Sequence, residues 1–399
     1  MAEKVIEVNN LFKIFGKNPE EAFPLIEKGL SKEEILEKTG NTVGVNDVSF
    51  TVNKGEIFVV MGLSGSGKST LIRCINRLME PNRGEILIED TDVSKLSKEE
   101  LMNFRKEKFG MVFQHFGLLP YRTVQKNVEY GLEVKKVKPS TRKKRAREAI
   151  KKVGLEGWED QKPQNLSGGM KQRVGLARAL AVDPDIFLMD EPFSALDPLI
   201  KKEMQDQLLE LYEEVNKTTI FITHDLNEAL KVGDKIAIMK AGKIVQMGSQ
   251  EEILTNAAND YVRDFVKDVD RSRVLKARDI MIKPKTLLKP DQGEGPRTAI
   301  HKMRENEISS IIVVDKDKKV MGILKIEEAL KILQNKDEEN LKKYIKEIPR
   351  VDPGDTMDDM FAQIAELDIP LPVVDKNDEL MGIIIKSNVL SNLAPEKVI

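Results

Sequence analysis

The stretch "EIFVVMGLSGSGKST" (56–70) decides the fold, because an apolar strand runs directly into a glycine-rich loop. Its loop satisfies the pattern G-x-x-x-x-G-K-[ST], and a helix is expected to begin near Lys68. Small residues in such a loop let backbone N–H groups turn toward phosphate oxygens, and the helix N-terminus adds positive potential. The sequence therefore predicts a nucleotide-binding loop made of Gly62, Leu63, Ser64, Gly65, Ser66, Gly67, Lys68, Ser69 and Thr70.

Around this loop, from about residue 44 to 265, short apolar strands alternate with amphipathic helical stretches. The clearest strands are "EIFVVM" (56–61), "DIFLMD" (185–190) and "TTIFIT" (218–223). This alternation is typical of an α/β domain with a largely parallel sheet.

An acidic pair ends the strand core that runs over 186–189. Asp190 is expected to hold the shell of Mg²⁺ together with the Ser69 hydroxyl, and Glu191 to polarise an attacking water. Lys68 is expected to bridge the β and γ phosphates. These assignments predict nucleotide hydrolysis rather than binding alone.

The composition excludes several classes of protein. The 399 residues include 64 basic and 66 acidic side chains, so there is no global attraction to nucleic acid or to a membrane. A single cysteine, Cys74, excludes an intramolecular disulfide, and it is expected to be a small buried hydrophobe. No apolar run approaches the roughly 18 to 20 residues that span a bilayer. Taken alone, the chain is expected to be cytoplasmic.

A second region follows the charged stretch 266–277 and contains an internal repeat offset by 60 residues: "IIVVDKDKKVMGILKIEEAL" (311–330) and "LPVVDKNDELMGIIIKSNVL" (371–390). Each copy is predicted to form a strand, a polar turn, a strand and a helix. Paired βαββα units of this kind resemble a tandem CBS domain, a regulatory unit whose copies pack through their sheets.

Between the glycine-rich loop and the acidic pair stands "LSGGMKQRVGLARAL" (166–180). With it, the first region resembles the ATP-binding subunit of an ABC transporter, an α/β P-loop domain with a helical subdomain. The ordered motifs are Phe15, the loop 62–70, Gln114 in "MVFQHFGLLP", 166–170, Asp190 and Glu191, "SALD" (194–197), and His224 in "ITHD".

This resemblance implies a role for each further motif residue. Phe15 would stack on adenine, and Gln114 would sense the γ phosphate through Mg²⁺ and water. His224 would contact the γ phosphate and position the water near Glu191. The signature residues Ser167, Gly168 and Gly169 would complete the ATP site of the opposite copy. The signature departs from the commonest form at Met170, where glutamine is usual.

The implied assembly is a homodimer that closes around two ATP molecules. It would act at the cytoplasmic face of the membrane, as a peripheral subunit under a transmembrane permease. The segment after Gln114 would touch that permease, and an extracytoplasmic module on another chain would bind the solute.

The segment 17–44 is an insertion that a minimal cassette lacks. Together with "LFKIFG" (11–16), "DEPFSALDPLIKKEMQDQL" (190–208) and the CBS pair, it resembles the ATPase subunit of glycine betaine or proline betaine importers. We therefore expect an ABC domain over 1–270 and CBS domains over 278–335 and 340–396.

Two features are candidates for regulation. The stretch 135–152 contains ten basic residues and one acid, with Ser140 or Thr141 as the expected helix cap. It could bind anionic lipid and report ionic strength, because salt screens charges beyond about 8 Å near 0.15 M; the alternative is a solvated basic face.

In the CBS pair, the positions that often bind adenosine carry other residues: Lys325 and Glu328 in one copy, Ile385 and Asn388 in the other. Binding of AMP or ATP there is therefore doubtful. A cyclic dinucleotide, no ligand, or a purely structural dimerisation role are the alternatives.

Three other functions compete with this interpretation. An ATPase for another small solute, such as an amino acid, would differ only in its partner chains. A soluble ABC ATPase of DNA repair or translation is disfavoured, because the chain has one cassette and no basic excess for nucleic acid. A regulator without turnover has no need of Lys68, Glu191 and His224 together.

Overall fold

The structure is a computed structural model that describes residues 3–393 except 115, 195, 216, 268, 270, 271, 273, 336, 337, 367 and 368. The chain forms two compact units, Met1–Val266 and Lys267–Ile399. Residues 394–396, the end of the second CBS domain as predicted (340–396), lie outside the described residues. Within the described part of the chain, no helix has the length and apolar character needed to cross a membrane.

The first unit is built on a six-stranded sheet in the order β10-β9-β3-β8-β7-β6. Its five neighbouring strands from β9 to β6 are parallel, and only β10 is antiparallel, which confirms the predicted sheet. The strands are β3 (Ile57–Met61), β6 (Phe109–Val112), β7 (Ile186–Asp190), β8 (Thr218–Thr223), β9 (Lys235–Lys240) and β10 (Lys243–Gly248).

An antiparallel sheet that the sequence did not suggest lies against it, in the order β2-β1-β4-β5. Phe50 of this sheet and Phe58 of the parallel sheet stack with ring centroids 4.6 Å apart, and both belong to one buried apolar cluster. The strands are β1 (Lys4–Phe15), β2 (Thr42–Asn53), β4 (Arg83–Ile88) and β5 (Thr91–Asp92).

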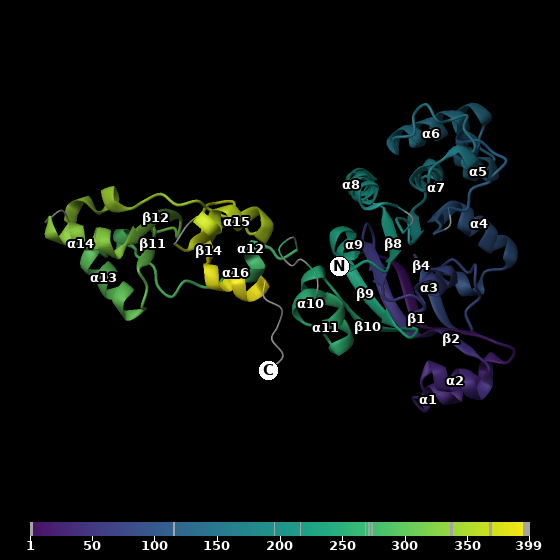
Figure 1. The fold of residues 1–399 in the computed structure, drawn as a ribbon, viewed down its shortest axis with the longest axis horizontal. Helices are drawn as coiled ribbons and strands as arrows, with labels where there is room; N and C mark the ends of the chain where they lie inside the picture. Colours follow the sequence, from purple (N-terminus) through teal and green to yellow (C-terminus); the bar gives the residue numbers. More distant parts are fainter. Residues whose placement is uncertain are drawn as a thin grey trace. The chain divides into compact units, whose positions relative to one another are not determined.

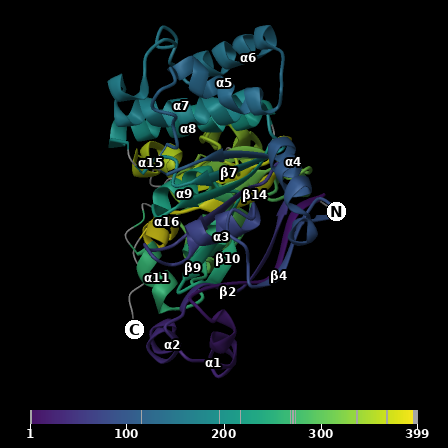
Figure 2. The ribbon, with the colours of Figure 1, turned by 90° about the vertical axis from the view of Figure 1, so that its right-hand side faces the viewer.

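Helices α5, α6 and α7 pack against one another and form the helical layer at one end of this unit (Figure 2). The cap expected at Ser140 or Thr141 is wrong: α6 begins at Pro139, whose fixed φ suits the first helical position. The helices of the unit are α3 (Lys68–Ile75), α4 (Lys98–Lys108), α5 (Val124–Val134), α6 (Pro139–Lys152), α7 (Gly168–Val182), α8 (Pro198–Val215), α9 (Leu226–Val232), α10 (Gln250–Thr255) and α11 (Asp260–Val266).

The insertion folds into a small helical unit, α1 (Phe23–Glu27) and α2 (Lys32–Thr39), between β1 and β2 (Figure 1). Phe23 meets Phe12 edge-on at 5.5 Å, and the Arg83 guanidinium lies 3.4 Å above its ring. Ser31 caps α2 through a capping box with Glu34. The insertion therefore has a small core of its own beside the end of β1.

The second unit contains the two predicted repeats, each with a two-stranded sheet. Backbone pairing crosses between them, because Ile282, which precedes the first repeat, pairs with Ile383, and Lys346, which precedes the second, pairs with Ile323. The elements are α12 (Ala277–Ile280), α13 (Pro296–Glu305), β11 (Ser310–Val314), β12 (Val320–Lys325), α14 (Ile326–Gln334), α15 (Met357–Glu366), β13 (Leu371–Val374), β14 (Leu380–Ile384) and α16 (Lys386–Leu393).

Candidate active site

The loop 62–70 joins β3 to α3, and two of its glycines have no room for a side chain. Gly62 and Gly67 have φ of +152° and +106°, which favour glycine. A Cβ at Gly67 would lie 2.2 Å from the Gly44 carbonyl oxygen, and one at Gly62 would lie 2.3 Å from that of Met239. Backbone from β2 and β9 thus supports the loop from behind.

Lys68, the first residue of α3, is only 4% exposed. Its ammonium donates hydrogen bonds to the carbonyl oxygens of Gly62 at 2.8 Å and Leu63 at 3.1 Å, and lies 3.9 Å from Glu191 Oε1. Burial lowers the pKa of Lys68, and the nearby carboxylates of Glu191 and Asp190 act against that shift. The loop's own carbonyls therefore hold the positive charge beside the acidic pair.

Asp190 ends β7 and is fully buried. Its carboxylate accepts hydrogen bonds from Ser69 Oγ at 2.8 Å and from Arg73 at 3.2 Å, so β7 and α3 are joined here. A hydroxyl and a carboxylate in contact provide the oxygen ligands that Mg²⁺ prefers, and the Ser69–Asp190 pair therefore fits that ion.

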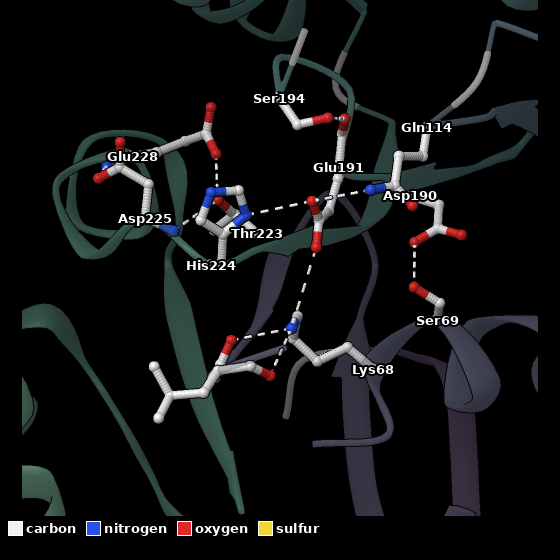
Figure 3. Close-up of polar contacts among 12 residues, drawn as sticks. Lys68, Ser69, Gln114, Asp190, Glu191, Ser194, Thr223, His224, Asp225 and Glu228 are labelled. Atoms are coloured by element: carbon white, nitrogen blue, oxygen red, sulfur yellow. Dashed lines mark hydrogen bonds and ion pairs between the residues drawn. The ribbon is translucent and has the colours of Figure 1, made fainter. Parts of the chain in front are cut away.

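Glu191 connects three parts of the site (Figure 3). Its Oε2 accepts a hydrogen bond from Gln114 Nε2 at 3.2 Å and lies 3.1 Å from His224 Nδ1, while Oε1 faces Lys68. Its φ is +48°, an uncommon conformation for a residue with a side chain. The polypeptide thus turns sharply where this carboxylate enters the site.

Phe15, at the end of β1, keeps 37% of its surface exposed. Its ring lies beside Gly44, where a Cβ would approach it to 2.7 Å, and the Lys13 ammonium lies 5.2 Å from the ring centroid. An exposed aromatic face near the loop 62–70 can accept a stacked base.

The signature residues are not joined to this group. Ser167 caps α7 by accepting a hydrogen bond from the Met170 backbone N–H at 3.2 Å. Ser167 and Gly168 are exposed, and among the described residues no hydrogen bond connects 167–169 with 62–70. One chain therefore brings together Lys68, Ser69, Gln114, Asp190, Glu191 and His224. Ser167 and Gly168, which are exposed, and Gly169, which is half-buried, stay apart from this group.

Some residues around the site escaped the sequence interpretation. Arg73, the second partner of Asp190, lies four residues after Ser69, and this helical spacing could have suggested it. Lys201 and Glu228, which lie behind His224, come from different helices, and no local pattern pairs them.

The basic helix α6 is not uniformly exposed. Arg142 Nε lies 3.1 Å from the Glu129 carboxylate, which is only 2% exposed and also contacts Lys126 at 3.0 Å. Lys143, Lys144 and their neighbours on the outer face are exposed. Arg142 therefore belongs to a buried ion pair between α5 and α6.

In the second unit, a cavity of about 290 Å³ lies between the repeats. Thr286, Ser309 and Ile385 are among the residues that line it, with the segment around Ile282 from the lead-in to the first repeat. Glu328 is not among the described residues that line this cavity; its carboxylate pairs with Lys331 at 3.2 Å and with Lys346 at 3.5 Å.

Comparisons with known proteins agree with these features. The family described as ABC transporter matches residues 45–194, and the family described as CBS domain matches 277–335 and 341–395. The glycine betaine/carnitine transport ATP-binding protein of Listeria monocytogenes is 49% identical, with 98% of both chains covered. The glycine betaine/proline betaine transport ATP-binding protein of Escherichia coli is 45% identical, again with 98% of both chains covered. A dimeric ATP-binding cassette, solved in a post-hydrolysis state with ADP and phosphate, is 34% identical with a TM-score of 0.53, covering 61% of this chain and 98% of that one.

Proposed function

Because this chain belongs to the ATP-binding subunits of ABC transporters for glycine betaine and related osmoprotectants, we propose that it drives uptake of a small quaternary ammonium solute. Subunits of this family hydrolyse ATP to power transport. The observation that carries the choice of solute is the likeness over the whole chain, through the nucleotide-binding unit and both repeats.

ATP binding is proposed at the loop 62–70, with adenine on Phe15. The ammonium of Lys68 would exchange the carbonyls of Gly62 and Leu63 for the β and γ phosphate oxygens. Because Lys68 is already buried and held, little side-chain entropy remains to be lost on binding. The loop's remaining backbone N–H groups would surround the phosphates.

Hydrolysis is proposed to depend on Glu191. Its carboxylate would accept a proton from the attacking water as the water oxygen bonds to the γ phosphorus and the bond from that phosphorus to the β–γ bridging oxygen breaks, releasing ADP. The Gln114 amide fixes one edge of the carboxylate, and His224 lies at the same oxygen, where it can orient the water toward the phosphate.

The Ser69–Asp190 pair, with Gln114 nearby, supports a magnesium site. The ion would neutralise negative charge on the phosphates. Ser69 and Asp190 are already in contact at 2.8 Å, so the oxygen ligands are close together before nucleotide binds.

Dimerisation is proposed because the signature is solvent-exposed and separate from the chain's own loop. Ser167 Oγ accepts from its own helix, which leaves its hydroxyl hydrogen available to donate to a phosphate oxygen in a second copy. The two copies would close around two ATP molecules and separate after hydrolysis.

The proposed permease contact is the segment 116–121, which follows Gln114. Tyr121 is 92% exposed and is therefore available for contact with a partner. The permease would hold this chain at the cytoplasmic face of the membrane. Solute recognition is assigned to an extracytoplasmic module on another chain.

Ionic regulation through anionic lipid is proposed for the exposed face of α6. The test keeps Arg142, because its loss would unpair the buried Glu129, and replaces Lys143, Lys144 and Arg145 with glutamine. Transport in vesicles containing anionic lipid should then depend less on salt. An unchanged salt dependence would contradict the proposal and favour a solvated basic face.

A cyclic dinucleotide is the proposed ligand of the CBS module. The residues present where adenosine would bind disfavour AMP, since Ile385 is apolar and Glu328 is engaged by two lysines, and this leaves a cyclic dinucleotide as the candidate to test. Calorimetry of the full chain with cyclic di-AMP, cyclic di-GMP and AMP tests this ligand. No heat with either cyclic dinucleotide would leave a structural role for the repeats.

The decisive experiment measures ATP-driven uptake of radiolabelled glycine betaine by vesicles containing this chain and its permease partners, across a salt series. Glu191→Gln is the control, because it keeps the shape of the side chain and removes the base. Uptake that disappears in the control supports a betaine importer. ATP hydrolysis without betaine uptake would overturn the choice of solute and redirect the test to amino acids.

A further inference from the structure

A group of polar and charged side chains lies beside His224, with two of its members buried and two half-buried. The residues on either side of His224, Thr223 and Asp225, both belong to this group, and Figure 3 shows them near Glu228. Lys201 completes it from α8. None of these four residues has a role in the proposed chemistry.

Glu228, in the first turn of α9, is 4% exposed. Its carboxylate accepts hydrogen bonds from the Thr223 hydroxyl and, at 3.2 Å, from Gln205 Nε2, and Lys201 Nζ lies 3.6 Å from Oε1. A buried carboxylate is costly unless it is paired, so each lost partner is expected to disturb this region.

Asp225 extends the same group to the backbone around His224. Its Oδ2 lies 2.7 Å from Lys201 Nζ, and its Oδ1 accepts from the Glu228 backbone N–H at 3.3 Å. Its own backbone N–H donates to Thr223 Oγ1 at 3.0 Å. The backbone is therefore fixed on both sides of His224, whose own side chain is 53% exposed.

The two turns that carry Glu191 and His224 lead into two different helices. The turn after Glu191, closed by the Ser194 backbone N–H at 3.3 Å, leads into α8, and the turn after His224 leads into α9. Lys201, in the first turns of α8, contacts the start of α9. Two contacts therefore connect the same two segments: Glu191 with His224 at the site, and Lys201 with Asp225 where the helices begin.

We propose that Lys201 and Glu228 are positioning residues, which hold α8 against α9 and thereby set the 3.1 Å contact between His224 Nδ1 and Glu191 Oε2. The inference rests on the proposed roles of Glu191 and His224 in ATP hydrolysis. It deepens that function, because it assigns the alignment of the water-activating pair to groups that never touch ATP.

The first test compares Lys201→Met with Lys202→Met, an exposed lysine one position further along α8. In ATPase assays of the full chain, Lys201→Met should lower kcat roughly tenfold and leave the KM for ATP within about twofold. This loss is smaller than the roughly 100- to 10,000-fold contribution of an acid–base group, because the pair is misaligned and not removed. Lys202→Met should match the wild type. An unchanged kcat in Lys201→Met would overturn the proposal.

The second test separates positioning from a general loss of stability. In a His224→Ala background, Lys201→Met should cause no further loss of kcat, because it acts through His224; an additive loss would overturn the proposal. Lys201→Arg should restore most of the activity. If Lys201→Met does not fold, Glu228→Gln tests the same prediction, and an unchanged kcat there contradicts it.

An error in the proposed catalytic role of Glu191 would give a different experimental result. If Glu191→Gln hydrolyses ATP as fast as the wild type, the assignment of Glu191 is wrong, and this holds for any kcat that Lys201→Met gives.

Discussion

Replacing Gly67 by alanine tests whether the nucleotide loop is shaped by the backbone behind it. Gly67 has φ of +106°, and an alanine Cβ there would lie 2.2 Å from the Gly44 carbonyl oxygen, far below the 3.4 Å of ordinary contact. That carbonyl cannot easily retreat, because Gly242 lies next to it and accepts a hydrogen bond from the Asn46 backbone N–H at 2.9 Å.

Gly65 provides a matched control within the same loop. Its φ is also positive, at +75°, but an added Cβ would meet nothing within 4 Å. We therefore expect Gly65→Ala to cost about 1 kcal/mol of backbone strain, partly offset by the stiffer unfolded chain. Gly67→Ala adds overpacking to a similar strain, for a total of about 3 kcal/mol or more.

The assay is urea unfolding of the full chain without nucleotide, followed by circular dichroism, with binding of a fluorescent ATP analogue as a second measurement. Gly67→Ala should unfold at clearly lower urea and bind the analogue much more weakly. Equal unfolding midpoints for Gly65→Ala and Gly67→Ala would refute the argument from crowding, since only the positive φ is common to both.

Three further predictions concern buried charges and the thiol. Arg142→Gln removes a partner of the buried Glu129 and should lower the free energy of unfolding by about 1–2 kcal/mol. Lys143→Gln, on the exposed face of α6, should change it by less than about 0.5 kcal/mol. Denaturation of the two variants in parallel measures the difference. Burial alone would raise the pKa of the Glu129 carboxyl, but hydrogen bonds from its partners hold it below its ordinary value of 4.5. The stability that ionised Glu129 contributes is therefore complete above pH 4.5 and is lost as the pH falls through its lower pKa in the folded chain. On acidification, the thermal unfolding midpoint should fall further in the wild type than in Arg142→Gln, which lacks part of this contribution. Burial raises the pKa of the Cys74 thiol to about 12; alkylation near neutral pH should be negligible in the native chain and rapid in urea, and fast native labelling would show that the thiol is accessible.

The sequence predicted those parts of the site that local pattern determines. The loop 62–70 lies between strand and helix as its spacing required, and Asp190 and Glu191 stand at the end of a buried strand. These features need only a few neighbouring residues, because the phosphate-binding geometry is built into one turn of backbone.

Contacts between distant residues could not be predicted in the same way. Glu129 and Arg142 come from separate helices, and Lys201 meets Asp225 only because α8 packs near α9. The wrong helix cap at Ser140 or Thr141 has a local cause: Pro139 is a strong signal for the first helical position, and it places the start of α6 before both residues.

The antiparallel sheet also escaped prediction, because its strands lie in distant parts of the chain and carry mixed burial patterns. β1 pairs with both β2 and β4, and its register shifts in several places. Periodicity alone does not identify such irregular strands.

The crossed backbone pairing between the repeats has a consequence for how the chain can be shortened by evolution. Ile282 lies in the segment that leads into the first repeat but forms hydrogen bonds with the second, while Lys346 leads into the second repeat but forms hydrogen bonds with the first. A stop codon between the repeats would leave the Ile282 segment without its strand partner and expose the apolar seam around Val314 and Ile323. Descendants of this gene should therefore keep both repeats or discard both, and a lineage with a single copy should be rare.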